Sequence, residues 1–287
     1  NSIVMLYCRL MKIPFFWWTG SWERPFNSSL IQTTLDRYQK FLWKMSHGAI
    51  VYNTAAKDKL INIGMNDKMI FIAQNTKDER SCLENKEKWL RMAALNRQQL
   101  KIALEAKIII FVGALTDEKR VDLLLEAFRV NNEKHADWYL IIVGDGPALD
   151  KLRDKCKVLD IRRVIFTGRI AENIYSYFFM CDVFVLPSLG GLAINDAMMC
   201  GKAVIVGSAD GTEKDLIVDG ITGHLLKSKD DRSLIVELAD KIEQILRNKD
   251  KYTQMGEAGF EHYMKVSSFE KMVDAFEHAV FETLKGK

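Results

Sequence analysis

Val183-Phe-Val-Leu-Pro-Ser-Leu-Gly-Gly-Leu-Ala-Ile-Asn-Asp-Ala-Met-Met-Cys-Gly201 is the stretch that decides the fold. Its first four residues are apolar and end at Pro187, which is the pattern of a buried strand. Two glycines follow, and residues 192–199 predict a short helix that ends before Gly201. Residues 203–206 are again apolar and predict a second buried strand. The chain therefore has a strand, a glycine-rich loop, a helix and a strand in direct succession.

The glycine-rich loop of this unit favours the binding of a nucleotide. The start of a helix leaves backbone N–H groups unpaired, and Gly190 and Gly191 carry no Cβ atom to keep a phosphate away. One turn into the helix, the Asp196 carboxylate is placed to accept hydrogen bonds from a sugar diol. A second interpretation is that Asp196 only favours the helix through its macrodipole. A phosphate cradle beside a diol acceptor predicts nucleotide recognition.

Ordered motifs along the chain resemble family 4 of the retaining glycosyltransferases, which have the GT-B fold of two facing Rossmann-like domains. The family pattern is Pro-Ser, a Gly-rich turn, Glu-Ala-Met-Ala-Cys-Gly-x-Pro-Val-Ile and then Asp-Gly-x-Thr-Gly. Residues 196–205 here read Asp-Ala-Met-Met-Cys-Gly-Lys-Ala-Val-Ile, and residues 219–223 read Asp-Gly-Ile-Thr-Gly. Upstream motifs that also resemble those of the family are Phe111-Val-Gly113 with Lys119, Gly144-Asp-Gly-Pro147 and Phe166-Thr-Gly168. The resemblance covers about residues 46 to 285.

The chain departs from the family pattern at positions that concern catalysis. Ala114 stands where an arginine is usual, and Ser188 replaces a glutamate eight residues before Asp196. Asp196 is itself a shortened glutamate, and Thr19-Gly20 stands where a histidine is often found. A subset of the family has a Gly-Gly-Leu turn like residues 190–192. The departures therefore concern the catalytic details more than nucleotide binding.

The length and composition narrow the possible classes of protein. A chain of 287 residues is long enough for two modest domains. A net charge of +3 from scattered basic residues argues against a nucleic-acid partner. Five cysteines without a Cys-x-x-Cys fit reduced thiols in a cytosol. No apolar run could span a bilayer, and no signal peptide is visible. We expect a cytoplasmic protein, and peripheral contact with the inner face of the cytoplasmic membrane stays open.

The sequence of the amino-terminal half predicts only a few strands. Apolar runs predict strands at residues 13–18, 49–52 and 69–73, and helices are predicted at 2–11, 27–46 and 54–61, the last capped by Thr54. A doubly wound domain needs about twice as many strands, and the chain opens at Asn1 without an initiator methionine. We therefore expect residues 1–100 to be an incomplete amino-terminal, acceptor-side Rossmann-like domain followed by a charged connector.

Strands and helices alternate regularly from residue 107 onwards. The predicted strands are residues 107–112, 138–143, 164–167, 183–186, 203–206 and 223–226. The predicted helices are residues 119–130, 148–159, 172–180, 192–199, 231–248, 251–264 and 268–284. This alternation indicates an α/β fold with parallel sheets, GT-B-like under the resemblance. We expect a nucleotide-sugar-binding Rossmann-like domain over residues 101–265, and a carboxyl-terminal helix, residues 266–287, packing back on the amino-terminal domain.

Candidate site residues follow from their positions and from the resemblance. Lys119, in the first turn of the helix after the strand at 107–112, lies at the carboxyl edge of the sheet, where open α/β folds bind ligands. The resemblance implies a phosphate partner for Lys119, whereas the plain alternative is a solvated surface lysine. We assign Lys119 and Asp196 as catalytic. The predicted donor-binding residues are Gly113, Arg169, Ile170, Ser188, Gly190, Gly191, Leu192, Asp196, Gly211 and Thr212.

Two turns receive different interpretations. Gly211-Thr212 opens a second predicted helix start, suited to a phosphate or to sugar hydroxyls. Gly144-Asp-Gly-Pro147 favours a turn and a helix start over a ligand contact, because Pro147 suits the first helical position. The five histidines share no metal-ligand spacing, so we expect no metal site and no cofactor, with the nucleotide-diphosphate sugar as co-substrate.

The resemblance implies a retaining, metal-independent hexosyltransferase that moves a sugar from a nucleotide-diphosphate-sugar donor to an acceptor hydroxyl. Family members commonly build cell-envelope polysaccharide or lipopolysaccharide, so the implied acceptor is a sugar or a lipid-linked sugar. Two alternatives stay open. One is a catalytically silent nucleotide-sugar-binding module, which Ala114, Ser188 and the incomplete amino half favour. The other is a GT-B sugar-nucleotide epimerase, which would need carboxylates and histidines in the cleft.

Overall fold

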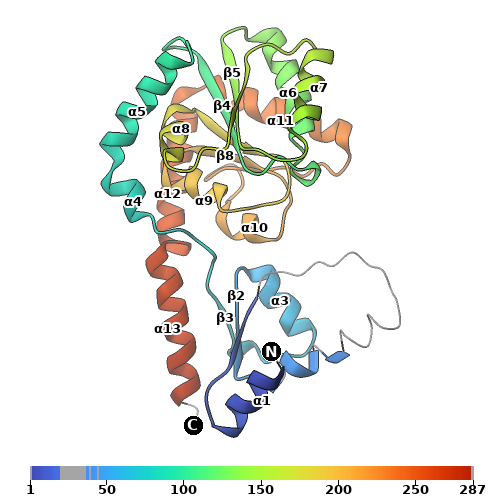
Figure 1. The fold of residues 1–287 in the computed structure, drawn as a ribbon, viewed down its shortest axis with the longest axis vertical. Coiled ribbons are helices and arrows are strands. Elements are labelled where there is room, and N and C mark those ends of the chain that lie inside the picture. Colours follow the sequence, from blue (N-terminus) through green and yellow to red (C-terminus); the bar gives the residue numbers. More distant parts are fainter. Residues whose placement is uncertain (1, 20–36, 39, 44, 286–287) are drawn as a thin grey trace. The chain divides into compact units, whose positions relative to one another are not determined.

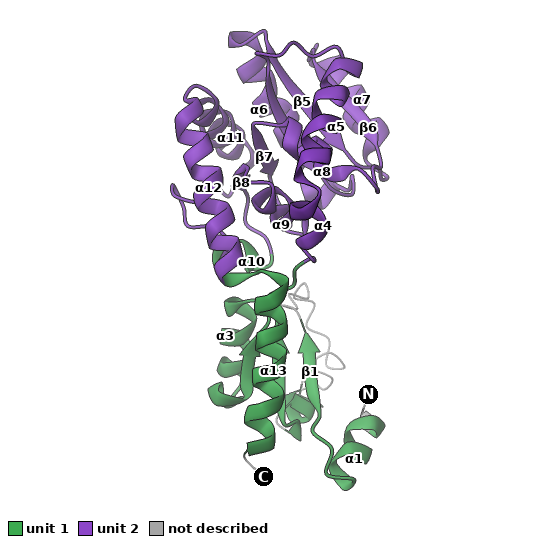
Figure 2. Ribbon diagram, turned by 90° about the vertical axis from the view of Figure 1, so that its left-hand side faces the viewer, with its two compact units in different colours: residues 1–76, 210–215, 266–287 green, residues 77–209, 216–265 purple. Residues whose placement is uncertain are grey.

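The computed structural model describes residues 2–19, 37–38, 40–43 and 45–285, and the chain forms two compact units (Figure 2). The first unit contains residues 1–76, 210–215 and 266–287. The second contains residues 77–209 and 216–265, all of which the structure describes. The charged segment that follows residue 76, expected as a connector, is therefore part of the second unit. Each unit has its own parallel sheet.

The sheet of the second unit has a doubly wound topology. Its strands are β4 (Lys107–Val112), β5 (Trp138–Val143), β6 (Val164–Gly168), β7 (Val183–Leu186), β8 (Ala203–Val206) and β9 (His224–Leu225). They pair in the order β6-β5-β4-β7-β8-β9, and every pair is parallel. The chain thus proceeds outward from β4 to β6 and then returns to the other side of β4. This confirms the predicted parallel α/β organisation.

The central strands are continuous apolar runs, because helices cover both faces of the sheet. Strands β7 and β8 are buried at every position, and β4 is fully buried from residue 108 to residue 111. A parallel sheet covered on both faces requires such uninterrupted burial, which explains why these runs do not alternate with polar residues. The predictions for β4, β5, β7 and β8 are confirmed residue for residue.

Two groups of helices lie on opposite faces of this sheet (Figure 1). One group consists of α6 (Val121–Lys134), α7 (Leu149–Val158) and α11 (Asp231–Leu246). The other consists of α5 (Lys86–Gln99), α8 (Ile174–Met180) and α9 (Ala193–Met199). The unit also contains α4 (Arg80–Glu84) and most of α12 (Lys249–Val266). The predicted apolar stripe of α6 is confirmed, since Val121, Leu124, Leu125 and Phe128 are all buried.

The first unit is smaller. Among its described residues, β1 (Phe16–Thr19), β2 (Gly48–Val51) and β3 (Ile70–Ile72) form a parallel sheet in that order. Its helical elements include α1 (Ser2–Leu10), α3 (Thr54–Asn62), the 3₁₀ turn η1 (Asp67–Met69), most of α10 (Thr212–Leu216) and α13 (Phe269–Lys285).

Alternating side chains of β2 divide the core of the first unit between two helices. Ala49 and Val51 pack with residues of α3, whereas Ile50, between them, packs with Ala279 and other residues of α13. This is the period of two expected of a strand covered on both faces. Helix α13, the last helix of the chain, therefore packs on the sheet formed by β1, β2 and β3.

The predicted helix cap at Thr54 is wrong, because Asn53 occupies that position with extended backbone and its side chain accepts a hydrogen bond of 2.8 Å from Ala56 N–H. Thr54 is instead the first helical residue. The helix predicted at residues 27–46 and the feature at Gly20 fall largely outside the described residues.

Candidate functional site

The carboxyl edge of the second unit's sheet brings several predicted site residues close in the fold. Strands β4 and β7 are neighbours, but the next strand in the chain lies on opposite sides of this pair: β5 is beside β4, and β8 is beside β7. In open α/β sheets, ligands bind outside the carboxyl ends of strands at such a switch point. The loops that follow β4, β6 and β7 carry Gly113, Lys119, Arg169 and Gly190.

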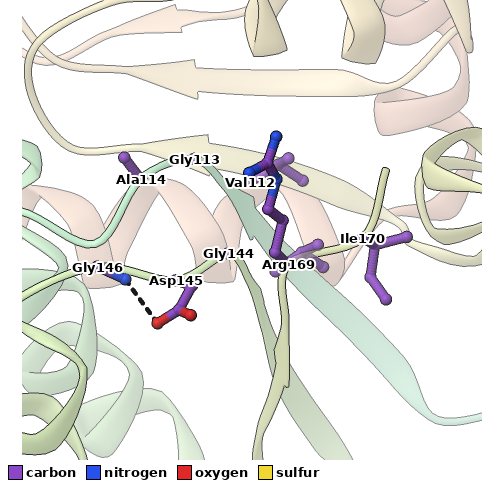
Figure 3. A pocket seen from close by; sticks show the side chains of 9 residues that line it. Val112, Gly113, Ala114, Gly144, Asp145, Gly146, Arg169 and Ile170 are labelled. Atoms are coloured by element: carbon purple, nitrogen blue, oxygen red, sulfur yellow. Dashed lines mark hydrogen bonds between the residues drawn. The ribbon is translucent and has the colours of Figure 1, made fainter. Parts of the chain in front are cut away.

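A pocket of about 560 Å³ lies at the ends of β4, β5 and β6 (Figure 3). Its lining residues are Val112, Gly113, Ala114, Val143, Gly144, Asp145, Gly146, Arg169 and Ile170. The side chain of Arg169 extends from the end of β6 toward Val112, so a guanidinium faces the pocket. Of the predicted donor-binding residues, Gly113, Arg169 and Ile170 therefore line one cavity.

Backbone hydrogen bonds hold the three strand ends of the pocket in register. The N–H of Gly113 donates to Val143 O at 3.0 Å, and the N–H of Gly144 donates to Gly168 O at 2.9 Å. Further out, Leu115 N–H donates to Asp145 O at 2.9 Å. A pocket whose walls are mutually bonded backbone is largely preformed, which lowers the entropy cost of binding a ligand.

Gly144, Asp145 and Gly146 of the Gly144-Asp-Gly-Pro147 turn line this pocket, and the preference for a turn and helix start over a ligand contact stays a prediction. Gly144 has φ +147°, and a Cβ atom there would lie 1.8 Å from Gly113 O. Glycine is thus required for the β5 loop to approach the β4 loop so closely. Pro147 lies two residues ahead of the first helical residue of α7, because Ala148 is the N-cap.

Lys119 bridges the loops that follow β4 and β7. Its Nζ donates to Leu189 O at 2.5 Å and to Gly190 O at 2.6 Å. The prediction that Lys119 lies in the first turn of α6 was wrong. Lys119 ends a 3₁₀ turn (Asp117–Lys119), and Arg120 has left-handed backbone with φ 50° before α6 begins. The turn separates Lys119 from α6 and directs its side chain to the neighbouring loop.

The loop between β7 and α9 contains Ser188, Gly190, Gly191 and Leu192. Leu189 has a positive φ of 42°, and Leu192 is the N-cap of α9 without a side-chain hydrogen bond. A Cβ atom on Gly191 would lie 3.6 Å from Lys119 Nζ, so Lys119 and the two glycines form one local cluster. None of these residues lines the pocket of Figure 3.

Asp196 is buried rather than presented on the surface of α9. Its side chain is 3% exposed, and Oδ2 accepts a hydrogen bond from Lys77 Nζ at 2.5 Å. The other oxygen, Oδ1, is buried and has no hydrogen-bond partner among the described residues. Burial raises the pKa of Asp196, and the Lys77 ammonium opposes that rise. The carboxylate therefore keeps one acceptor atom without a partner.

Gly211 and Thr212 belong to the first unit. Asn53 Nδ2 donates to Thr212 Oγ1 at 3.1 Å and to Asp210 O at 3.2 Å, while the N–H of Thr54 donates to Asp215 Oδ2 at 2.7 Å. The start of α3 is thus bonded to the segment that contains α10. The structure assigns Gly211 and Thr212 this local packing role, and a ligand role for them stays a prediction.

Sequence reasoning missed Lys77 and the pocket residues Val112, Val143 and Asp145. Lys77 is 119 positions from Asp196 and lies in a charged stretch where no pattern distinguishes one lysine from another. The position of Asp145 in a Gly-Asp-Gly turn directly after a buried strand was a usable signal, because strand ends of this kind line ligand sites.

In the described part of the chain, no three His, Cys, Asp or Glu side chains gather as metal ligands would. No helix among the described residues is long and apolar enough to cross a membrane.

Comparison with known proteins connects this geometry to a family. The sequence model described as "Glycosyl transferases group 1" matches residues 93–262. Lipopolysaccharide 1,2-N-acetylglucosaminetransferase of Salmonella typhimurium is 29% identical over 195 residues, covering 63% of this chain and 50% of that protein. N-acetyl-alpha-D-glucosaminyl L-malate synthase of Bacillus anthracis is 29% identical over 194 residues, covering 66% of this chain and 49% of that protein. The chain spans about half the length of these relatives.

Solved structures share the fold. HepE of Anabaena in complex with UDP superposes with a TM-score of 0.77 at 20% identity, covering 99% of this chain and 76% of that one. The carboxyl-terminal domain of a group 1 glycosyl transferase of Francisella tularensis superposes with a TM-score of 0.52 at 26% identity. That match covers 60% of this chain and 91% of the other. The α/β fold with parallel sheets is thus that of GT-B glycosyltransferases.

Proposed function

The chain belongs to the group 1 glycosyltransferase family, and from this membership we propose that it transfers a sugar from a nucleotide-diphosphate-sugar donor to an acceptor hydroxyl. The observation that carries the proposal is the preformed pocket at the ends of β4, β5 and β6, with Lys119 on the loop after β4. A cavity walled by backbone and flanked by a lysine suits a nucleoside attached to a negatively charged diphosphate.

Each part of the donor has a candidate partner. The nucleoside would enter the pocket, with its base against Arg169 and the backbone of Ile170. The diphosphate would lie toward Lys119, whose ammonium has three N–H donors and can keep one loop carbonyl while binding a phosphate oxygen. The ribose diol would donate to Oδ1 of Asp196, the acceptor atom that has no partner in the described residues.

We further propose that transfer proceeds with retention and without a metal cofactor, as in the family that the motifs resemble. The bond between the anomeric carbon and the diphosphate oxygen breaks, and the acceptor oxygen bonds to the same face of that carbon. The acceptor proton passes to the leaving diphosphate. Lys119 and the backbone N–H groups at residues 190–192 would stabilise the developing negative charge, each by roughly 3–4 kcal/mol.

The relatives support the choice of donor and acceptor. HepE of Anabaena has been solved with UDP and with UDP-glucose, and the Salmonella typhimurium relative is named for N-acetylglucosamine transfer in lipopolysaccharide. On this support we propose a UDP-sugar as the first donor to test. A sugar or a lipid-linked sugar of the cell envelope is the proposed acceptor, reached by peripheral contact of the protein with the membrane.

Calorimetry of this chain with UDP-glucose, UDP-N-acetylglucosamine, GDP-mannose and ADP-glucose tests donor binding. We expect one nucleotide to bind in the micromolar range or tighter, which corresponds to about −8 kcal/mol. Failure of all four to bind would contradict the proposal. Where a product forms, the anomeric proton coupling in its NMR spectrum reports whether configuration is retained, and incubation with a chelator reports whether a metal takes part.

Donor binding without transfer is a second candidate function, and Ala114 favours it. This residue lines the pocket with a methyl group at a position where the family pattern has an arginine. The diphosphate would then have one cation fewer to stabilise its leaving charge. Donor hydrolysis by Ala114→Arg, compared with the unchanged chain, separates the two. If the chain is a silent binder, the added arginine should raise hydrolysis, whereas an active transferase should show turnover without it.

A further inference from the structure

An ion pair connects the start of the second unit to α9. Lys77 Nζ lies 2.5 Å from Asp196 Oδ2, and the lysine side chain is 38% exposed while the aspartate side chain is 3% exposed. Oδ1 of the same carboxylate is buried and has no hydrogen-bond partner among the described residues. Lys77 therefore binds the carboxylate through Oδ2, while Oδ1 makes no hydrogen bond among the described residues. The hydroxyl of Tyr175 on α8 makes a further, smaller contribution that lowers the pKa of Asp196.

Lys77 is itself anchored by its main chain. The hydroxyl of Tyr263, a fully buried residue of α12, donates to Lys77 O at 3.4 Å. The same hydroxyl lies 3.5 Å from Glu79 Oε2, two residues further along the chain. Packing against α12 thus fixes the backbone from which the Lys77 side chain reaches Asp196.

The other titratable groups near Asp196 come from α4, α8, α9 and α12. They are Glu79 and Cys82 beside or on α4, Tyr175 on α8, Cys200 at the end of α9, and Tyr263 on α12. Burial raises the pKa of Tyr175 and of Cys200, so both stay uncharged at neutral pH. Lys77 is the cation whose charge acts on Asp196 in the described part of the chain.

A buried carboxylate without a counter-charge takes up a proton, because burial disfavours its charged form. Removing one partner of a buried pair leaves the other charge uncompensated. A protonated Asp196 would still accept a hydrogen bond, but it would lose the stronger bond that an ionised acceptor makes with a hydroxyl. The charge state of Asp196 therefore depends chiefly on Lys77, with a smaller contribution from Tyr175.

We propose that Lys77 is a positioning residue for donor binding, which keeps Asp196 ionised and leaves Oδ1 free to accept a donor hydroxyl. The inference rests on the proposed function, because it assigns the unused oxygen to the nucleotide sugar. Lys77 acts through Asp196 and itself needs no contact with the donor.

UDP binding measured by calorimetry between pH 5.5 and pH 8.5, with GDP in parallel, tests this role in the whole chain. The variants are Lys77→Met, Lys77→Arg and the control Lys157→Met, which breaks the exposed pair with Asp154. Lys77→Met should weaken UDP binding, and the loss should deepen by up to about tenfold for each pH unit below the pKa of Asp196 in the variant. Lys77→Arg and Lys157→Met should follow the unchanged chain at every pH.

Thermal unfolding without ligand provides a second readout that changes in the opposite direction. A carboxyl whose pKa is raised on folding costs stability above that pKa and costs none below its unfolded value near 3.8. The loss of Tm in Lys77→Met should therefore be largest at pH 8.5 and shrink toward pH 5.5. A lysine that only supports packing would give losses of Tm and of affinity that do not depend on pH.

The outcomes separate the two proposals. If the unchanged chain binds neither UDP nor GDP, the proposed function fails, while the Tm series still reports whether Lys77 controls the charge of Asp196. If the chain binds UDP but Lys77→Met loses the same factor at every pH, the inference is overturned. In an Asp196→Asn background, Lys77→Met should cause no further pH-dependent loss, and any further loss of that kind would also overturn it.

Discussion

The Nζ atom of Lys119 lies 2.6 Å from the carbonyl oxygen of Gly190, which joins the loop after β4 to the loop after β7. These two strands are neighbours at the point where the strand order reverses. The contact places a cation beside the adjacent Gly190 and Gly191, so charge and close backbone approach coincide. A diphosphate requires both.

Lys119→Ala should weaken UDP binding far more than uridine binding, because only UDP carries charge for the ammonium to pair with. Hydrogen bonds to charged groups contribute about 1.5–3 kcal/mol, so the expected loss for UDP is roughly tenfold to a hundredfold. Calorimetry with both ligands measures the difference. Equal losses for the two would indicate that the variant disturbs the loop rather than a phosphate contact.

Asp196→Asn should keep the fold and weaken nucleotide binding by about 1.5–3 kcal/mol, since an amide replaces an ionised acceptor of nearly the same shape. Binding of UDP and of 2′,3′-dideoxy-UDP should be measured side by side. The substitution should matter for UDP and have little effect on the ligand that lacks the diol. An equal effect on both would remove the ribose from the role of Asp196.

Arg169→Ala should weaken uridine binding and leave the binding of inorganic pyrophosphate nearly unchanged. The reason is that Arg169 lines the pocket at the end of β6, away from the Lys119 cluster on the β7 loop. Removing the guanidinium should cost about 0.5–2 kcal/mol if it stacks on the base. Unchanged uridine affinity would mean that the base lies elsewhere.

Gly144→Ala should lower the free energy of unfolding by several kcal/mol, because the added Cβ would lie 1.8 Å from Gly113 O in a backbone of φ +147°. Gly220→Ala is the matched control. Gly220 also has a positive φ, +83°, but a Cβ there meets nothing within 4 Å, so about 1–2 kcal/mol is expected. Urea denaturation of both variants tests the ranking, and a reversed order would contradict the close approach of the two loops.

Asp219 should give the second unit a stability contribution that is lost in acid. Burial raises the pKa of this carboxyl, but hydrogen bonds from Lys227, the Leu225 N–H and His224 outweigh burial and lower the pKa to about 2. A lowered pKa stabilises the fold above the unfolded value of 3.8, and the contribution disappears as pH falls through about 2.

Asp219→Asn tests that contribution. The variant should be less stable than the unchanged chain at pH 6, and the difference should shrink as the pH is lowered from 4 toward 2. A difference in Tm that stays constant over this range would show that the carboxylate charge contributes nothing.

Much of the second unit could be predicted from the sequence because its signals are local. The apolar runs of β4, β5, β7 and β8 have no polar interruptions, and Pro187 ends one of them. A run of that kind is buried wherever it lies in the sheet, so its prediction needs no knowledge of its neighbours. Parallel pairing then follows, since each strand is succeeded by a helix.

Predictions at element ends were weaker. Asn53 and Thr54 are both good helix caps, and only the observed backbone shows which of them has the extended conformation that capping requires. Likewise, no pattern indicated that Arg120 would adopt left-handed backbone and separate Lys119 from α6. Such choices depend on which side-chain contact the neighbouring loop can offer.

By itself, the sequence determined the parallel α/β architecture, the glycine-rich loop after β7 and the lysine that follows β4, because each depends on residue type at short spacing. Only the tertiary structure decided that Gly144-Asp-Gly146 lines a pocket with Arg169 and that Lys77 neutralises a buried Asp196. These relationships join residues far apart in the chain. They arise from the order of strands in the sheet and from burial, and burial turns a surface-type residue such as aspartate into a group whose charge depends on one distant partner.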